Sequence, residues 1–114
     1  MNFENPLFNF AILISPVFII AGIILYKFPP KKINHLYGYR TKRSMKNQEV
    51  WDFSQKYSAK VMTVLGFLYF IILLILSNFT FPESTVLIIG LGLMIVLSLG
   101  IFIIVEKKLK QKFQ

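Results

Sequence analysis

The only long polar stretch of this chain runs from Asn34 to Lys60 and reads NHLYGYRTKRSMKNQEVWDFSQKYSAK. It holds the single Trp, the single His, both Arg residues and three of the five Tyr residues of the 114-residue chain. Hydrophobic runs flank it on both sides. The arrangement of those runs predicts the fold, and any functional site is expected within the polar stretch itself.

Three apolar blocks surround the polar stretch, at residues 8–26, 61–79 and 86–105, and none contains a charged residue. Each is roughly 20 residues long, which is enough for a helix to cross a bilayer core of about 30 Å. A soluble protein of 114 residues could not surround three such helices. The sequence therefore predicts an all-α membrane protein.

Its three transmembrane helices are expected at about residues 8–27, 60–79 and 85–105, in a single membrane domain of residues 1–114. A cytoplasmic segment of about residues 28–59 would join the first two. Small residues on the third span would allow close helix contact, namely Gly90, Gly92, Ser98 and Gly100. Residues 106–114 are expected to form a solvated basic tail.

The basic residues predict how the chain is oriented. All 13 Lys and Arg residues lie in residues 27–60 and 107–112, whereas the N-terminal arm and the second turn carry Glu4 and Glu83. Basic residues favour the cytoplasmic side of a membrane. We expect a multi-pass protein of the cell membrane with its N-terminus outside and its C-terminus in the cytoplasm.

The net charge of +8 is interpreted in the same way. It lies beside membrane spans, where an anionic leaflet attracts basic residues, so the predicted partner is the lipid bilayer and not nucleic acid. The chain has no Cys, and His35 has no companion at metal-ligand spacing. No recognisable triad links His35 to Asp52 and Ser54. The sequence therefore predicts no catalytic residue, no metal and no cofactor, and thus a protein that is not an enzyme.

The second half of the polar stretch predicts a helix. Val50, Phe53, Tyr57 and Val61 recur at helical spacing and form one apolar stripe, and either Ser44 or Asn47 would cap the start. We expect an amphipathic cytoplasmic helix between the first and second spans that runs into the second span. Two placements remain open: along the inner membrane surface, or against the other helices.

Several residues of the stretch are candidate contacts to a lipid headgroup, a peptide or a partner. The planar guanidinium of an Arg matches phosphate geometry, and Tyr and Trp suit the membrane interface. Trp51 would either anchor its helix there or pack it against the spans. The candidates are Tyr39, Arg40, Arg43, Asn47, Trp51 and Tyr57.

The same stretch resembles the signature of the SdpI immunity-protein family. The resemblance covers about residues 34–66 and rests on Gly38-Tyr39-Arg40-Thr41, Arg43-Ser44-Met45-Lys46-Asn47, Trp51 and Lys56-Tyr57-Ser58. Two positions differ from the common pattern: Lys42 stands where Pro is frequent, and Ala59 stands where Gly is frequent. Ala59 favours a continuous helix.

This resemblance implies a bacterial multi-pass membrane protein. The family's namesake, which is longer, protects a producing cell from its own secreted toxic peptide, which collapses the membrane potential. It also holds a transcriptional repressor at the membrane, so a cytoplasmic regulator is a second implied partner. With no catalytic set, and no charged residue in a span to drive ion-coupled export, protection is expected to work by non-catalytic binding.

An alternative function is a structural or accessory membrane protein that binds a larger complex. The sequence does not choose between these two functions, and it leaves open whether the protein forms oligomers.

Overall fold

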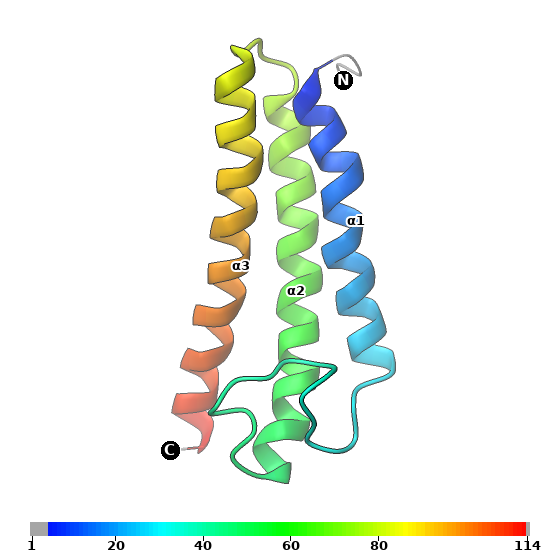
Figure 1. Ribbon diagram of the computed structural model, residues 1–114, viewed down its shortest axis with the longest axis vertical. Coiled ribbons are helices and arrows are strands. Elements are labelled where there is room, and N and C mark those ends of the chain that lie inside the picture. The colour runs from blue at the N-terminus through cyan, green and yellow to red at the C-terminus, as the bar shows by residue number, and fades with distance from the viewer. Residues whose placement is uncertain (1–4, 114) are drawn as a thin grey trace.

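The computed structural model describes residues 5–113, and these form three helices joined by a long loop and a short turn (Figure 1). The helices are α1 (Pro6–Lys27), α2 (Gln48–Leu76) and α3 (Glu83–Phe113). Successive helices run in opposite directions, and α2 lies between α1 and α3 (Figure 1). No strand occurs within residues 5–113, so the predicted all-α class is confirmed.

All three helices are long and apolar enough to cross a membrane. Large apolar side chains cover their outer faces. Exposing these side chains to water would be unfavourable, whereas contact with lipid would not be. Among the most exposed are Leu13, Val17, Ile88, Val96 and Ile103, each at least 60% exposed. The protein is therefore a multi-pass membrane protein, as its sequence predicts.

The two ends of the bundle differ in composition. We call one end of the bundle the basic end. There α1 ends at Lys27, just before Pro29-Pro30, and α2 begins at Gln48. The last turns of α3, which are rich in lysine, lie at the same end. The loop of residues 28–47 lies at this end (Figure 1). At the other end, the side-chain oxygen of Asn5 caps α1 by accepting from Leu7 N at 2.9 Å, and its amide donates to Phe79 O at 2.7 Å. Asn5 thereby ties α1 to the turn between α2 and α3.

α1 and α2 approach most closely at two glycines. A Cβ on Gly22 would collide with Thr63 Oγ1 and lie 2.9 Å from Thr63 N, and a Cβ on Gly66 would lie 2.9 Å from Ile19 Cγ1. Small residues allow this approach because helix association in lipid depends on packing contact. The sequence predicted close helix contact on the third span and did not indicate these two positions.

On α3, only part of the predicted small-residue face is used for packing. A Cβ on Gly90 would lie 2.8 Å from the Phe10 ring, and Gly90 O accepts from Tyr69 Oη at 2.9 Å. By contrast, nothing lies within 4 Å of a Cβ on Gly92, and Ser98 is exposed. Gly90 therefore joins α3 to both other helices, whereas Gly92 faces open space.

The structure does not support the predicted amphipathic cytoplasmic helix between the first two spans as an element of its own. Residues 28–47 contain no helix, and the amphipathic sequence forms the first turns of α2. Of the two placements left open, packing against other helices is the one observed, since Val50 is 2% exposed and Ala59 fully buried. Ala59 continues the helix, as expected.

The basic tail is also packed and not solvated throughout. α3 continues to Phe113, Leu109 is fully buried, and the Phe113 ring meets the Phe53 ring edge-on at 5.5 Å between centroids. The apolar residues at 105, 109 and 113 recur every four positions and so form one helical face. The lysines occupy the other faces of the same turns.

We predict that Gly22→Ala lowers the stability of the bundle by roughly 1–3 kcal/mol, because the new methyl group overlaps the α2 backbone. Gly92→Ala is the matched control and should be neutral or slightly stabilising, because Ala favours helix and its methyl group meets nothing. SDS titration of detergent-solubilised protein, followed by circular dichroism, measures both. Equal effects of the two substitutions would contradict the close α1–α2 contact.

Candidate functional site

Gln55 holds the long loop onto the start of α2. Its side chain is fully buried, its Oε1 accepts from Tyr39 N at 2.7 Å, and its Nε2 donates to Tyr39 O at 2.9 Å. One amide side chain thus satisfies both backbone groups of a loop residue. Buried backbone groups need such partners, because an unpaired one costs about 1–3 kcal/mol.

Gly38 is required by this contact. Its φ is +103°, a backbone conformation that residues other than glycine rarely adopt. A Cβ at this position would also overlap Gln55 Oε1 and lie 2.8 Å from Pro30 Cγ. Only glycine lets the backbone turn so close to Gln55. The Gly-Tyr pair of the signature is therefore explained by the packing of the loop.

Trp51 fixes the first part of the loop. Its indole is fully buried, and Nε1 donates to Pro30 O at 2.8 Å. The indole therefore packs inside the protein and satisfies the carbonyl of the second proline of the diproline stop. Of the two roles considered from the sequence, packing is the one observed.

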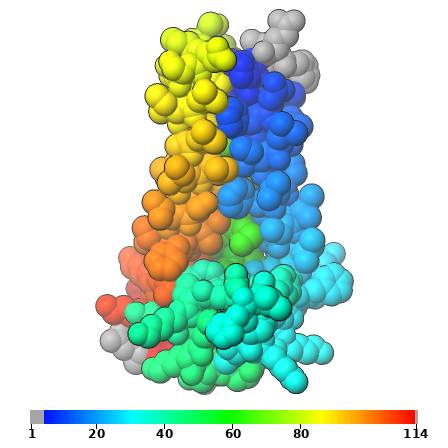
Figure 2. Space-filling view, in the orientation of Figure 1, coloured from blue at the N-terminus to red at the C-terminus, as the bar shows by residue number. Residues whose placement is uncertain are grey.

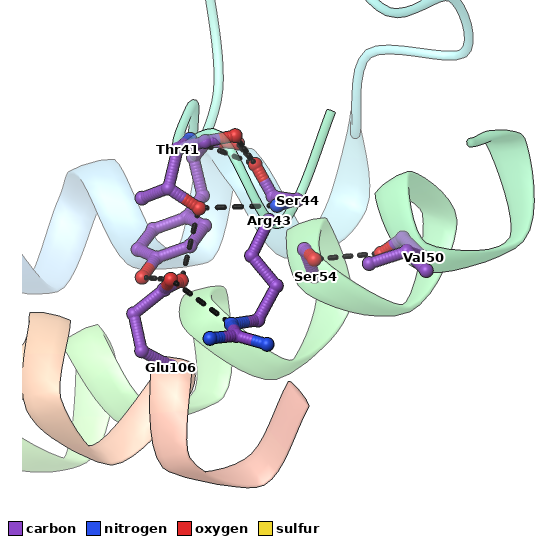
Figure 3. A network of polar contacts seen from close by, with 7 residues as sticks. Thr41, Arg43, Ser44, Val50, Ser54 and Glu106 are labelled. Carbon is purple, nitrogen blue, oxygen red and sulfur yellow. Dashed lines mark hydrogen bonds and ion pairs between the residues drawn. The ribbon is translucent and has the colours of Figure 1, made fainter. Parts of the chain in front are cut away.

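A tight turn follows Tyr39. Thr41 N donates to Ser44 Oγ at 2.8 Å, and Ser44 N donates to Thr41 Oγ1 at 3.1 Å. Ser44 is fully buried in this turn, so the cap of α2 is Asn47, whose Oδ1 accepts from Val50 N at 2.9 Å. The reciprocal Thr41–Ser44 bonds orient the hydroxyl of Thr41 and the side chain of Arg43 toward α3 (Figure 3).

Glu106 of α3 receives three groups from the loop (Figure 3). Its Oε2 accepts from Tyr39 Oη at 2.7 Å and from Thr41 Oγ1 at 2.9 Å, while its Oε1 lies 3.6 Å from Arg43 Nε. This is the one ion pair within residues 5–113. Hydrogen bonds to a charged group are stronger than neutral ones, so the cluster joins the last turns of α3 to the loop.

The environment of Tyr39 keeps its hydroxyl protonated. Burial raises the pKa of Tyr39 far above its usual value of 10, and the hydrogen bond to Glu106 and that carboxylate's negative charge raise it further. The phenol is consequently a permanent donor to Glu106 at any physiological pH. Its role in this structure is to hold the loop in place.

The structure places the six predicted site residues in different surroundings. Tyr39 and Arg43 meet at Glu106, Asn47 caps α2, and Trp51 is in the core. Tyr57 is half-buried and stacks on Phe53 at 5.5 Å between centroids. Arg40 is exposed, and its Nη1 donates to His35 O. Four of the six therefore support the loop or α2, whereas Arg40 is exposed and has no carboxylate partner within residues 5–113.

Two residues central to this arrangement were missed from the sequence. Gln55 lies on the buried face of α2 with Ser54 and Ser58. An amphipathic pattern predicts that polar residues such as these face water. Glu106 was assigned to the basic tail. A signal was present for Glu106, because it is the one acidic residue after Glu83 and directly follows an apolar run.

Two pockets flank the loop. The loop pocket, of about 360 Å³, is lined by apolar side chains of α1 and α2 and by five consecutive loop residues: Ala21, Leu25, Tyr37, Gly38, Tyr39, Arg40, Thr41 and Met62. The second, of about 430 Å³, is lined by Lys42, Arg43, Lys46 and Glu106. Figure 2 shows a recess directly above the loop, with α2 visible between α1 and α3.

The residues that line the loop pocket are suited to binding a ligand. Its walls offer apolar surface from two helices, and its floor offers the Arg40 side chain and loop backbone. Apolar pockets with a few convergent polar groups are typical of ligand sites. Across residues 5–113, no group of three His, Asp or Glu residues could hold a metal ion.

Comparison with known proteins assigns the chain to a family. The model of the SdpI/YfhL protein family matches residues 31–105. The chain belongs to this family. An uncharacterized protein, YfhL, of Bacillus subtilis (strain 168) is 41% identical over 92 residues, which cover 81% of this chain and 78% of that protein. No solved structure matches the chain.

Family membership supports a membrane protein of the immunity type. The segment that matches the SdpI/YfhL family contains most of the loop, all of α2, and α3 up to Val105. It therefore includes Gln55 and the five loop residues of the loop pocket, whereas Glu106 follows directly after it. The resemblance seen in residues 34–66 is thereby confirmed and extended.

We predict that Gln55→Leu loosens the loop without unfolding the bundle, because it leaves Tyr39 N unpaired and Tyr39 O with only the longer hydrogen bond from Ser44 Oγ at 3.2 Å. Trypsin cleavage after Arg40, Lys42 or Arg43 in detergent should become about tenfold faster, since cleavage follows the population of the opened loop. Gln111→Leu, at an exposed position of α3, is the control and should be cleaved like wild type. Unchanged cleavage of Gln55→Leu would show that Gln55 does not hold the loop.

Proposed function

We propose that this protein protects a bacterial cell against a membrane-active toxic peptide, and that it does so by binding the peptide without catalysis. The observation that carries the proposal is the loop pocket, in which loop residues 37–41, including the signature residues 38–41, meet apolar side chains of α1 and α2. A membrane-active peptide is amphipathic and so presents both apolar and polar groups. The loop pocket offers surface for both.

Arg40 is the residue that we assign to the polar groups of the peptide. It lines the loop pocket, is exposed and donates from Nη1 to His35 O, whereas Arg43 is paired with Glu106. A guanidinium contacts a carboxylate through two parallel hydrogen bonds, which a Lys ammonium cannot reproduce. A bound peptide would shift the bundle only through contacts that differ between its states, and we propose that the Arg40–His35 contact is exchanged for a contact to the peptide.

We further propose that the basic end faces the cytoplasm. The proposal rests on the location of every Lys and Arg residue at or near this end, together with the positive-inside tendency of membrane proteins. The loop pocket would then lie in the cytoplasmic half of the bilayer. A toxin would reach it through the membrane and not from the external water.

The orientation is tested with single Cys residues, since the chain has none of its own. Intact cells carrying Asn5→Cys, Lys46→Cys, Glu83→Cys or Gln111→Cys are treated with a membrane-impermeant thiol reagent. We expect labelling at positions 5 and 83 and none at 46 and 111 until the cells are permeabilised. Labelling at 46 but not at 83 would reverse the orientation.

The function is tested by deletion and re-expression. A deletion strain is challenged with the toxic peptide against which the family's namesake protects, while a potential-sensitive dye is recorded. We expect Arg40→Lys and Arg40→Ala to restore less polarisation than wild type at equal abundance in the membrane. Lys108→Ala removes one exposed charge from the same end and should protect fully.

Full protection by both Arg40 variants would remove Arg40 from the mechanism. Recovery of cleaved peptide from protected cells would refute non-catalytic binding. A deletion strain no more sensitive than its parent would favour the alternative of a structural or accessory membrane protein.

A further inference from the structure

A second groove lies between α1 and α2, away from the loop pocket. Its volume is about 570 Å³, and it is lined by Ile23, Tyr26, Lys27, Ala59, Lys60, Thr63 and Val64. This groove and the loop pocket share no lining residue. We call it the α1–α2 groove.

Small residues along the helix seam create this groove. Because Gly22 has no side chain, α1 lies against the backbone of α2 at Ala59 and Thr63. No large side chain fills the bottom of the groove at this point. Ile23 and Val64 rise as apolar walls and are 41% and 58% exposed. Thr63 Oγ1 donates to Ala59 O at 2.8 Å, so the hydroxyl needs no external partner and the floor suits an apolar occupant.

The mouth of the groove is positively charged. Lys56 Nζ donates to Tyr26 O at 2.9 Å and lies 4.5 Å from the centroid of its ring, so it is committed to the end of α1. Lys60 Nζ lies 5.8 Å from the same centroid. Within residues 5–113, neither Lys27 nor Lys60 pairs with a carboxylate, because the one ion pair there joins Arg43 to Glu106. Asp52, the carboxylate nearest in sequence on α2, accepts from Gln48 instead.

The position of the groove matches the depth of a lipid headgroup. Tyr26 and Lys27 form the last turn of the first span, directly before the diproline stop. Aromatic and basic side chains gather at this depth because their apolar parts remain in the bilayer while their polar ends reach the headgroups. An apolar groove with two free ammonium groups at its mouth is complementary to an acidic amphiphile.

We propose that the α1–α2 groove binds one acidic glycerophospholipid, with an acyl chain along its floor and the phosphate between Lys27 and Lys60. Anionic headgroups are attracted to such basic clusters beside membrane spans. A second copy of the chain is a poorer occupant, because an isologous contact would bring the same lysines together. This site is independent of the proposed peptide function.

Native mass spectrometry of protein purified in mild detergent tests the proposal. Phosphatidylglycerol and phosphatidylcholine with identical acyl chains are titrated separately, and sn-glycerol 3-phosphate is added in excess as a soluble phosphate. We expect one phosphatidylglycerol per chain, bound roughly tenfold more tightly than phosphatidylcholine and not displaced by glycerol phosphate. Equal binding of the two lipids, or displacement by glycerol phosphate, would overturn the proposal.

Variants separate the two parts of the site. Lys27→Gln/Lys60→Gln should lose the preference for phosphatidylglycerol, whereas the control Lys107→Gln/Lys110→Gln, with the same change of charge at the same end, should keep it. Val64→Trp fills the groove, leaves both lysines in place and should weaken phosphatidylglycerol binding about as much. Equal loss in the control pair would reduce the effect to net charge, and unaltered binding by Val64→Trp would place the lipid elsewhere; either result refutes the site.

Discussion

The paired hydrogen bonds between Gln55 and the Tyr39 backbone are the contact around which the basic end is built. They bring a loop without secondary structure against an apolar helix bundle, where unpaired backbone groups would be costly. The approach requires a glycine at position 38 with positive φ. It also sets the direction of the following turn, from which Thr41 and Arg43 reach Glu106. Much of the polar signature thus has a structural reason.

Glu106 extends this arrangement to the third helix. α1 and α2 pack along a seam of small residues, whereas α3 depends on a few specific links, among them the Tyr69–Gly90 hydrogen bond and the cluster at Glu106. The loop thereby connects all three helices at one end, as Asn5 connects α1 to the turn at the other. A ligand that displaced Tyr39 or Arg43 from Glu106 would break the polar contact between the loop and α3. This makes the loop a suitable element for coupling a bound peptide to the shape of the bundle.

The two sides of the α1–α2 pair offer different surfaces. On one side, the loop closes the apolar walls and presents Arg40 beside its own backbone. On the other, the groove ends in free lysines with no loop over them. A guanidinium in a shaped pocket favours a specific carboxylate or phosphate, and ammonium groups at an open mouth favour a mobile headgroup. This division would account for Arg at the proposed peptide site and Lys at the proposed lipid site.

The sequence by itself determined the helical class, the three apolar spans and the family. Runs of about 20 apolar residues have few alternatives in a bilayer, and the signature Gly38–Thr41 identified the family. Tertiary structure alone decided which polar residues are buried. Gln55 and Ser58 look solvent-facing in an amphipathic pattern, yet they are fully buried. Gln55 exchanges hydrogen bonds with the backbone of Tyr39 in the loop, and Ser58 donates to Gln55 O within α2. The pairing of Tyr39 with Glu106 joins residues 67 positions apart, and no local pattern specifies a contact over that distance.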